Sequence, residues 1–170
     1  MPDPKETVNE IGLAIIGCGT IGRIRAKFAR EYQGVKWLGL CDINEELGRK
    51  LAADVDADFF TTDAEELIKR SEVNATMNIT EENKHTEPTL MAVEQGHKLF
   101  IEKPLATEAR ESKQILDAIT IEGLDACIGY TQRFRRRFLT VKERLSTGQI
   151  GDVHSVVTRA FMNRMVPIAT

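Results

Sequence analysis

A glycine-rich loop at residues 17–22, which reads GCGTIG, most constrains the fold of this chain. It follows an apolar run at residues 11–16 and precedes a stretch at 21–32 whose apolar positions recur at helical spacing. Closely spaced glycines allow a sharp change of chain direction and a close approach of neighbouring backbone. The loop therefore predicts a strand, a tight turn and a helix in direct succession.

The alternation of apolar runs and helical stretches continues through most of the chain. Strands that are apolar on both faces, each followed by a helix, need a parallel sheet covered on both sides. We therefore expect an α/β fold, a doubly wound parallel sheet of the Rossmann type. The expected strands are 11–16, 35–41, 59–60, 75–79, 98–101 and 126–129, and the expected helices are 21–32, 45–53, 64–70, 86–95 and 108–122.

The character of the chain changes after Gly129, so we expect a first domain at residues 1–130 and the incomplete start of a second, α+β domain at 131–170. Apolar residues recur at helical spacing over residues 134–147, which predicts an amphipathic helix. Residues 153–162 alternate, which predicts a strand of a sheet with one solvent-facing side.

The glycine loop has the spacing of a dinucleotide-binding turn. Gly17 permits the tight turn, Gly19 lets the backbone approach a pyrophosphate, and Gly22 lets the helix pack close to the strand. The start of the helix, at Thr20 and Ile21, then faces the anion with its unpaired N–H groups. The loop therefore predicts a bound dinucleotide.

Asp42 ends the second apolar run, about 20 residues after the glycines, where a carboxylate accepts hydrogen bonds from the adenosine ribose. The carboxylate would repel a 2'-phosphate, and the adjacent Ile43 and Asn44 bring no cation to neutralise one. We therefore expect NAD as the cofactor rather than NADP. Arg49 lies more than a helical turn further on and could be recruited to a 2'-phosphate, which leaves NADP as an alternative.

A second constellation, Glu102-Lys103-Pro104, directly follows the expected strand at residues 98–101. Ligands of open parallel sheets bind beyond the carboxyl ends of the strands, so we expect Lys103 to lie near the cofactor. A partly desolvated lysine there can act as a general base on a substrate hydroxyl. From spacing alone, a solvated lysine before a loop proline is the alternative.

Four motifs occur together in order: GLAIIGCGTIG at 12–22, Asp42, IEKPLA at 101–106 and GYTQRF at 129–134. On these motifs the sequence resembles the Gfo/Idh/MocA family, which includes glucose-fructose oxidoreductases and inositol dehydrogenases. The resemblance implies an NAD-dependent oxidoreductase that transfers a hydride between a sugar or polyol carbinol carbon and the nicotinamide. This chain would carry mainly the cofactor-binding half of that enzyme.

The resemblance also implies roles for particular residues. Lys103 would be the catalytic residue, beside the nicotinamide and the substrate hydroxyl. The glycine loop, Asp42 and Ile43 would hold the cofactor. The remaining residues implied for the cofactor cleft are Thr80, His85, Glu102, Gln132 and Arg133.

The chain departs from the family pattern at several positions. Family members often have a His where this chain has Arg25, and a Pro where it has Glu81. The family's second catalytic pair, an Asp and a His of the second domain, has no counterpart before Thr170. We therefore expect the chain alone to bind NAD but to turn over poorly or not at all.

Composition bounds the remaining function classes. A formal net charge of -3 speaks against nucleic-acid and membrane partners, and no apolar run is long enough to span a membrane. The N-terminus lacks the apolar segment of a signal peptide, so a cytoplasmic protein is expected. Cys18, Cys41 and Cys127 form no C-x-x-C pair, which indicates no metal site, and all three are expected to be small buried thiols.

Two other readings stay open at this point. One is a non-catalytic dinucleotide-binding or partner-binding module whose strand at 153–162 pairs with another subunit. The other is nucleic-acid binding through the sequence RFRRRF at 133–138, against which the net charge argues. The family resemblance favours neither, and implies a homo-oligomer that acts on a small sugar or polyol.

Overall fold

The structure is a computed structural model and describes residues 10–159 and 161. The chain divides into two compact units, Met1–Tyr130 and Thr131–Thr170, and each is described by itself. The assignment of the second unit as the start of a substrate domain stays a prediction.

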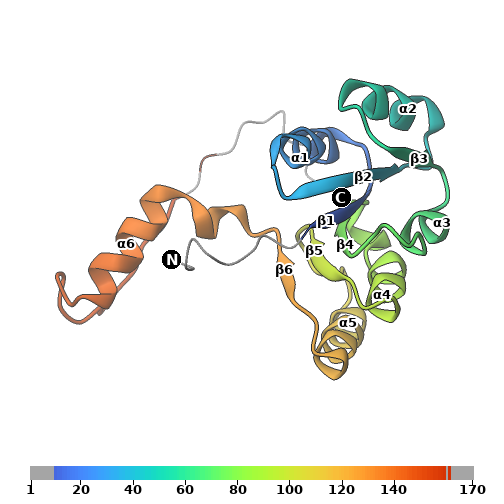
Figure 1. Cartoon of the computed structure of the whole chain (residues 1–170). Coiled ribbons are helices and arrows are strands. Elements are labelled where there is room, and N and C mark those ends of the chain that lie inside the picture. Colours follow the sequence, from blue (N-terminus) through green and yellow to red (C-terminus); the bar gives the residue numbers. More distant parts are fainter. Residues whose placement is uncertain (1–9, 160, 162–170) are drawn as a thin grey trace. The chain divides into compact units, whose positions relative to one another are not determined.

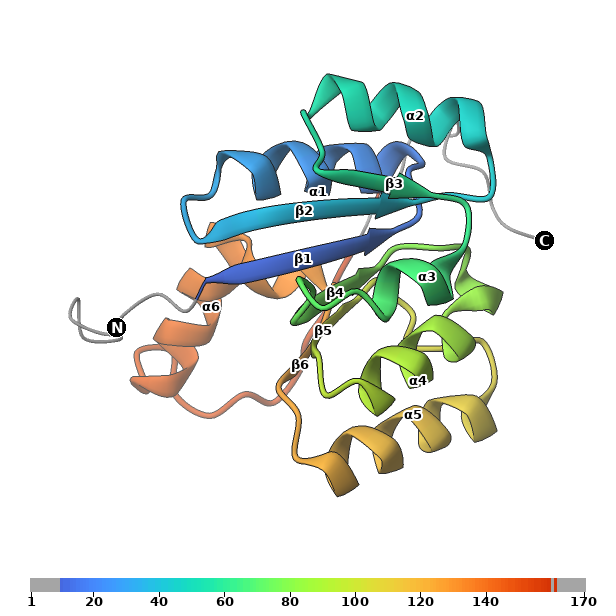
Figure 2. The same cartoon turned by 45° about the vertical axis from the view of Figure 1, so that its right-hand side comes forward.

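Within the described part of the first unit, six parallel strands form one sheet in the order β3-β2-β1-β4-β5-β6 (Figures 1 and 2). The order runs outward from β1 through β2 and β3, and then resumes on the other side of β1 with β4. The strands are β1 (Ile11–Ile16), β2 (Val35–Cys41), β3 (Phe59–Thr61), β4 (Ala75–Asn78), β5 (Lys98–Ile101) and β6 (Ala126–Ile128). The expected doubly wound parallel sheet is confirmed, and its switch point lies between β1 and β4.

Helices cover both faces of this sheet, as Figure 2 shows. Leu13 and Ile15 of β1 pack with α1 and α2 on one face, whereas Ala14 and Ile16 pack with α3, α4 and α5 on the other. A strand enclosed on both sides must be apolar throughout, which explains the unbroken apolar run of β1. The helices are α1 (Thr20–Glu31), α2 (Glu45–Asp54), α3 (Ala64–Ile68), α4 (Thr86–Glu94) and α5 (Ala109–Glu122).

Local signals set several of the helix ends. The Asn44 side chain accepts a hydrogen bond from Leu47 N at 3.0 Å and so caps the start of α2. The Asp63 side chain does the same for α3, accepting from Glu65 N at 2.9 Å. Gly123 ends α5 in the left-handed conformation with φ of 63°, where a side chain would be strained.

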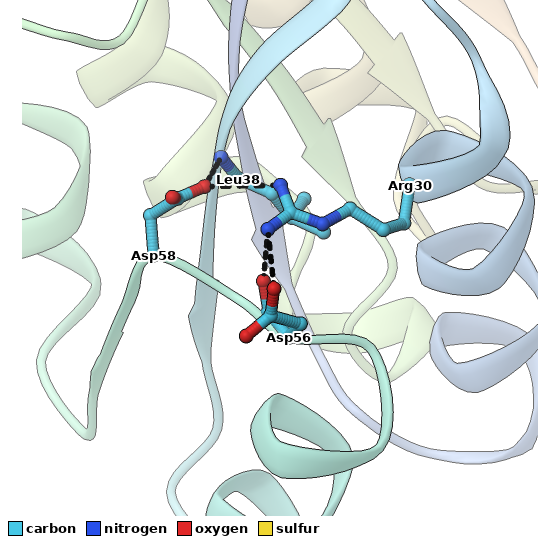
Figure 3. A network of polar contacts seen from close by, with 4 residues as sticks. All are labelled: Arg30, Leu38, Asp56 and Asp58. Carbon is cyan, nitrogen blue, oxygen red and sulfur yellow. Dashed lines mark hydrogen bonds and ion pairs between the residues drawn. The ribbon is translucent and has the colours of Figure 1, made fainter.

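The end of α1 away from the glycine loop is tied to the sheet by an ionic network (Figure 3). Arg30 pairs with Asp58 at 3.2 Å and with Asp56 at 3.3 Å. The same oxygen of Asp58 accepts a hydrogen bond from Leu38 N of β2 at 2.8 Å. The network therefore holds α1, β2 and the loop before β3 together.

The second unit contains a 3₁₀ turn, η2 (Thr131–Phe134), and the helix α6 (Arg136–Ser146). The helix expected at 134–147 is thus present, although it starts two residues later. The strand expected at 153–162 is wrong for residues 153–159, which form no strand. Alternating polarity does not make a strand without a hydrogen-bonding neighbour, and no described segment pairs with these residues. Met162 lies outside the described residues.

Two of the three cysteines match the expected burial. Cys18 and Cys41 are buried, but the expectation for Cys127 is wrong, because its side chain is exposed. Cys127 lies on β6, which pairs with β5 alone among the described strands and forms an edge of the sheet. An edge strand lacks a neighbour on one side, so an apolar run there is not proof of burial.

Cys127 should be the fast-reacting thiol of the folded protein. Burial, followed by the nearby Asp42 carboxylate, raises the pKa of Cys18 to about 12, and the same causes raise that of Cys41 to about 12. Since the thiolate is the reactive form, Ellman's reagent should titrate one thiol quickly and the other two after denaturation. Cys127→Ser should abolish the fast phase; a fast phase that survives this change would contradict the assignment.

His97 should make the protein less stable in mild acid. Its Nδ1 lies 2.9 Å from Thr76 Oγ1, and burial lowers the His97 pKa. Below about pH 6.5 the unfolded chain takes up a proton at this residue that the native state resists, so the free energy of unfolding falls as the pH drops. Urea unfolding measured from about pH 7.5 down to about pH 5 should show this loss of stability. His97→Asn should reduce it, and the matched change at exposed His154 should not.

Candidate functional site

Two glycines of the loop after β1 have no room for a side chain. A Cβ added at Gly17 would lie 2.4 Å from Ile79 O, and its φ of +100° also disfavours other residues. A Cβ added at Gly22 would lie 1.9 Å from Gly17 O. The loop is therefore folded tightly between the carboxyl end of β4 and the first turn of α1.

Gly19 is different, because an added Cβ there would meet no atom within 4 Å. It is the N-cap of α1 and provides no side chain to satisfy the N–H groups of the first helical turn. Thr20 and Ile21, which begin the helix, are exposed. The turn thus presents open backbone and unpaired donors, which is the arrangement that binds a phosphate group.

Asp42 ties the glycine loop to the end of β2. Its Oδ2 accepts a hydrogen bond from Cys18 N at 2.6 Å, and its Oδ1 accepts one from Asn44 N at 2.8 Å. A carboxylate oxygen has two lone pairs, so each oxygen can accept one further bond. Asp42 therefore both fixes the loop and keeps capacity for ribose hydroxyls. The sequence spacing indicated the second role, but not the first.

A cleft of about 1230 Å³ runs along the carboxyl ends of β1, β2 and β4. It is larger than the roughly 300–1,000 Å³ of sites for drug-sized ligands, so it has room for an extended ligand. Its open glycine turn and fixed carboxylate fit a dinucleotide. Of the residues expected to bind the cofactor, the cleft is lined by Gly17, Gly19, Thr20, Ile21, Gly22, Asp42, Ile43 and Thr80.

The walls of this cleft are acidic. Besides Asp42, its lining carboxylates are Asp63, Glu81, Glu87, Glu94 and Glu111. Among the described lining residues the only Lys or Arg is Lys84, which is itself paired with Glu81 at 3.1 Å. Arg49 is not in the lining and pairs with Glu45 at 2.7 Å. A 2'-phosphate beside Asp42 would therefore meet a carboxylate and no neutralising cation of the described lining other than the paired Lys84, which favours NAD over NADP.

His85 lies beneath the cleft and does not line it. Its side chain is 1% exposed, with Nδ1 at 2.7 Å from Pro104 O and Nε2 at 3.2 Å from Thr80 O. It thereby joins the loop after β4 to the turn after β5. The expectation that His85 binds the cofactor stays a prediction, and its observed contacts are those of a residue that holds two loops together.

Asn78, at the end of β4, organises the same region and was not singled out from the sequence. Its amide nitrogen donates to His85 O at 2.8 Å and to Thr89 Oγ1 at 2.9 Å. Its amide oxygen accepts from Thr80 Oγ1 at 2.8 Å. A buried amide at a strand end needs such partners, so a polar residue closing an apolar strand was the available signal.

Lys103 follows β5 at the carboxyl edge of the sheet, in a turn that contains a cis Lys103-Pro104 peptide bond. Its ammonium Nζ lies 3.3 Å from Glu82 Oε1, and its side chain is 57% exposed. Glu102 is mostly buried and pairs with Arg25 of α1 at 2.7 Å. Neither Glu82 nor Arg25 was expected at the site. Both are distant in sequence from their partners, so only the folded sheet brings them together.

The other expected residues, Gln132 and Arg133, lie in η2 of the second unit. Their proximity to the nicotinamide and substrate stays a prediction. Within residues 10–159, no group of three His, Cys, Asp or Glu side chains is placed to hold a metal ion. None of the helices that the structure describes is long and apolar enough to cross a membrane.

The reversing parallel sheet, the glycine turn and the carboxylate at the end of β2 define a dinucleotide-binding Rossmann domain. Comparison with known proteins gives this domain its family. Residues 11–130 match the model of the Gfo/Idh/MocA family, described as an oxidoreductase family with an NAD-binding Rossmann fold. The chain belongs to this family, and NAD is the cofactor that the family binds.

Several relatives are inositol dehydrogenases. The chain is 33% identical to an inositol 2-dehydrogenase of Gluconacetobacter diazotrophicus over 84% of this chain and 43% of the relative. It is 24% identical to the NAD(+)-dependent scyllo-inositol 2-dehydrogenase of Bacillus subtilis over 84% of this chain and 42% of the relative. The chain thus spans less than half the length of these relatives.

A solved structure shares the fold. The scyllo-inositol dehydrogenase of Lactobacillus casei, determined with bound NAD(H) and scyllo-inositol, superposes with a TM-score of 0.80 at 20% identity. The match covers 85% of this chain and 43% of that one. This likeness confirms the Rossmann architecture.

The acidic cleft should make the chain prefer NADH over NADPH. We expect NADH to bind at least about tenfold more tightly in a fluorescence titration, since a 2'-phosphate beside Asp42 is repelled. Asp42→Asn should narrow the difference between the affinities for NADH and NADPH. Asp125→Asn removes an exposed carboxylate that is not in the lining and should leave it unchanged. Equal affinities for the two nucleotides would refute the preference.

Proposed function

We propose that this chain is the cofactor-binding part of an NAD-dependent dehydrogenase of sugars or polyols. The observation that carries the proposal is the position of Lys103, an exposed amine directly after β5. The glycine loop and Asp42 lie at the same carboxyl edge of the sheet. The substrate class comes from the inositol dehydrogenases among the relatives.

Different residues of the cleft would bind different parts of the cofactor. The open turn at Gly19 and the start of α1 would hold the pyrophosphate, and the remaining lone pairs of Asp42 would accept hydrogen bonds from the adenosine ribose hydroxyls. Ile43 and Thr80 line the walls beside them. NAD bound there would supply a hydride acceptor for the substrate carbinol carbon.

Lys103 has the role of moving the hydroxyl proton. The ammonium that pairs with Glu82 first gives up a proton to solvent. The neutral amine then takes the proton of the substrate hydroxyl while the carbon loses a hydride, so that the alcohol becomes a carbonyl compound and Lys103 becomes an ammonium again. Glu82 is the partner of Nζ at 3.3 Å in this structure. The lone pair of the neutral amine accepts the substrate proton, and a remaining N–H of Nζ can keep its hydrogen bond to Glu82.

The family resemblance supports the rest of the proposal. Gln132 and Arg133 contribute to the nicotinamide and substrate end of the site. His85 supports the cofactor end by holding the loop after β4 and the turn after β5 together. The intact protein is proposed to be a cytoplasmic homo-oligomer, and its remaining substrate contacts come from a second domain.

Lys103→Ala in the intact protein should test this role. We expect kcat on a polyol substrate to fall by about a hundredfold or more, because a positioned general base contributes roughly 10²–10⁴. NAD affinity should change little, since the pyrophosphate and ribose contacts lie elsewhere. Lys103→Arg should not restore turnover, because a guanidinium does not give up its proton.

Lys98→Ala provides the matched control. Lys98 begins the same strand at its amino end and pairs with the exposed Asp125, so its loss should leave kcat unchanged. Normal turnover by the Lys103→Ala enzyme would refute the assignment of Lys103 as the base.

A further inference from the structure

We propose that Arg25 is a positioning residue for Lys103, and that it acts through the carboxylate of Glu102. This role presupposes the proposed function of Lys103 in proton transfer. Arg25 lies on α1, the helix whose first turn faces the cleft, whereas Lys103 lies in the turn after β5. The link between these two elements is a chain of two contacts.

Each oxygen of the Glu102 carboxylate has its own partner. Oε1 lies 2.7 Å from Arg25 Nη2, and Oε2 accepts a hydrogen bond from the backbone N–H of Lys103 at 3.2 Å. The side chains of Arg25 and Glu102 are only 27% and 13% exposed. A pair this far removed from water is screened less than a surface ion pair, so the guanidinium holds the carboxylate firmly.

Packing fixes the guanidinium from the sheet side. Arg25 Cζ lies 4.7 Å from the ring centroid of Phe100, two residues before Glu102 on the same chain segment. A cation over an aromatic face is attracted by the ring, and the flat guanidinium is well suited to stacking there. Arg25 therefore contacts both the last part of β5 and the residue that follows it.

The carboxylate also lies close to Gly129, the residue after β6. A Cβ added at Gly129 would lie 2.9 Å from the carboxylate carbon of Glu102. Gly129 is held in place by its own backbone, since its N–H donates to Ile101 O at 2.8 Å. Glu102 thus lies in a slot formed by the Arg25 guanidinium and the Gly129 backbone, where its ion pair with Arg25 holds the carboxylate.

The turn that carries Lys103 is consequently held on both of its flanks. On one flank Arg25 and Glu102 fix the Lys103 N–H, and on the other His85 contacts Pro104 O at 2.7 Å. Removal of Arg25 would leave a largely buried carboxylate without its counter-ion, and such a group moves toward water or toward another cation. Either movement releases the backbone of Lys103 while the cofactor contacts of Asp42 and the glycine loop remain.

Amide hydrogen exchange of the chain, followed by NMR, measures this link without any turnover. In Arg25→Met, whose long apolar side chain still covers Phe100, we expect the Lys103 N–H to exchange roughly fivefold faster, as for one lost hydrogen bond. NAD affinity should stay close to that of the unmodified chain. Arg25→Lys restores the positive charge and should recover part of the protection.

Arg30→Met is the matched control, because Arg30 is another ion-paired arginine of α1 whose partners lie at the far end of the helix (Figure 3). It should leave Lys103 exchange unchanged. In the intact protein, Arg25→Met should lower kcat by roughly ten- to a hundredfold through misplacement of the base, with Arg25→Lys again recovering part of the loss.

Wild-type exchange at Lys103 in Arg25→Met would overturn the positioning role, and so would a loss of NAD affinity that accounts for the whole fall in activity. If Arg25→Met fails to fold, Glu102→Gln gives the same test. It keeps an oxygen for the Lys103 N–H but loses the charge that Arg25 binds, and unchanged exchange would again refute the inference. Normal turnover of Lys103→Ala would instead refute the proposed function and leave the exchange result standing.

Discussion

The geometry of the site depends on the two hydrogen bonds that the carboxylate of Asp42 accepts. By accepting hydrogen bonds from Cys18 N and Asn44 N, it holds the turn after β1 and the turn after β2 against each other. Gly17 and Gly22 allow the loop to fold this closely, because a side chain at either position would meet backbone atoms. The two turns at the switch point of the sheet are therefore joined by hydrogen bonds without any ligand, and such preorganisation lowers the entropy lost on binding.

Local signals explain why so much of the fold could be predicted. The bounds of β2 and β5 agree with the expected runs to the residue, and Gly96 and Gly123 marked the ends of helices. The expected cofactor residues from Gly17 to Ile43 all lie in one cleft. Each of these features depends on residues close together in the chain, where spacing and residue type carry the information.

The contacts that could not be predicted join residues far apart in the sequence. Arg25 meets Glu102, and Lys103 meets Glu82, only because the helices and strands between them have been placed. The strand expected at 153–162 and the burial expected for Cys127 failed for a related reason. Both depend on whether a neighbour is present beside the segment, and no pattern within the segment reports that.

The slot around Glu102 also bears on how this sequence can change over evolutionary time. A side chain at position 129 is excluded by a flexible carboxylate, which could turn aside if Arg25 did not hold it. Tolerance of a larger residue at 129 is thus set by the residue at 25, more than a hundred positions earlier. Substitutions at positions 25, 102 and 129 should therefore be correlated in descendants of this protein. They should occur in combinations that either keep the slot or remove all three of its parts.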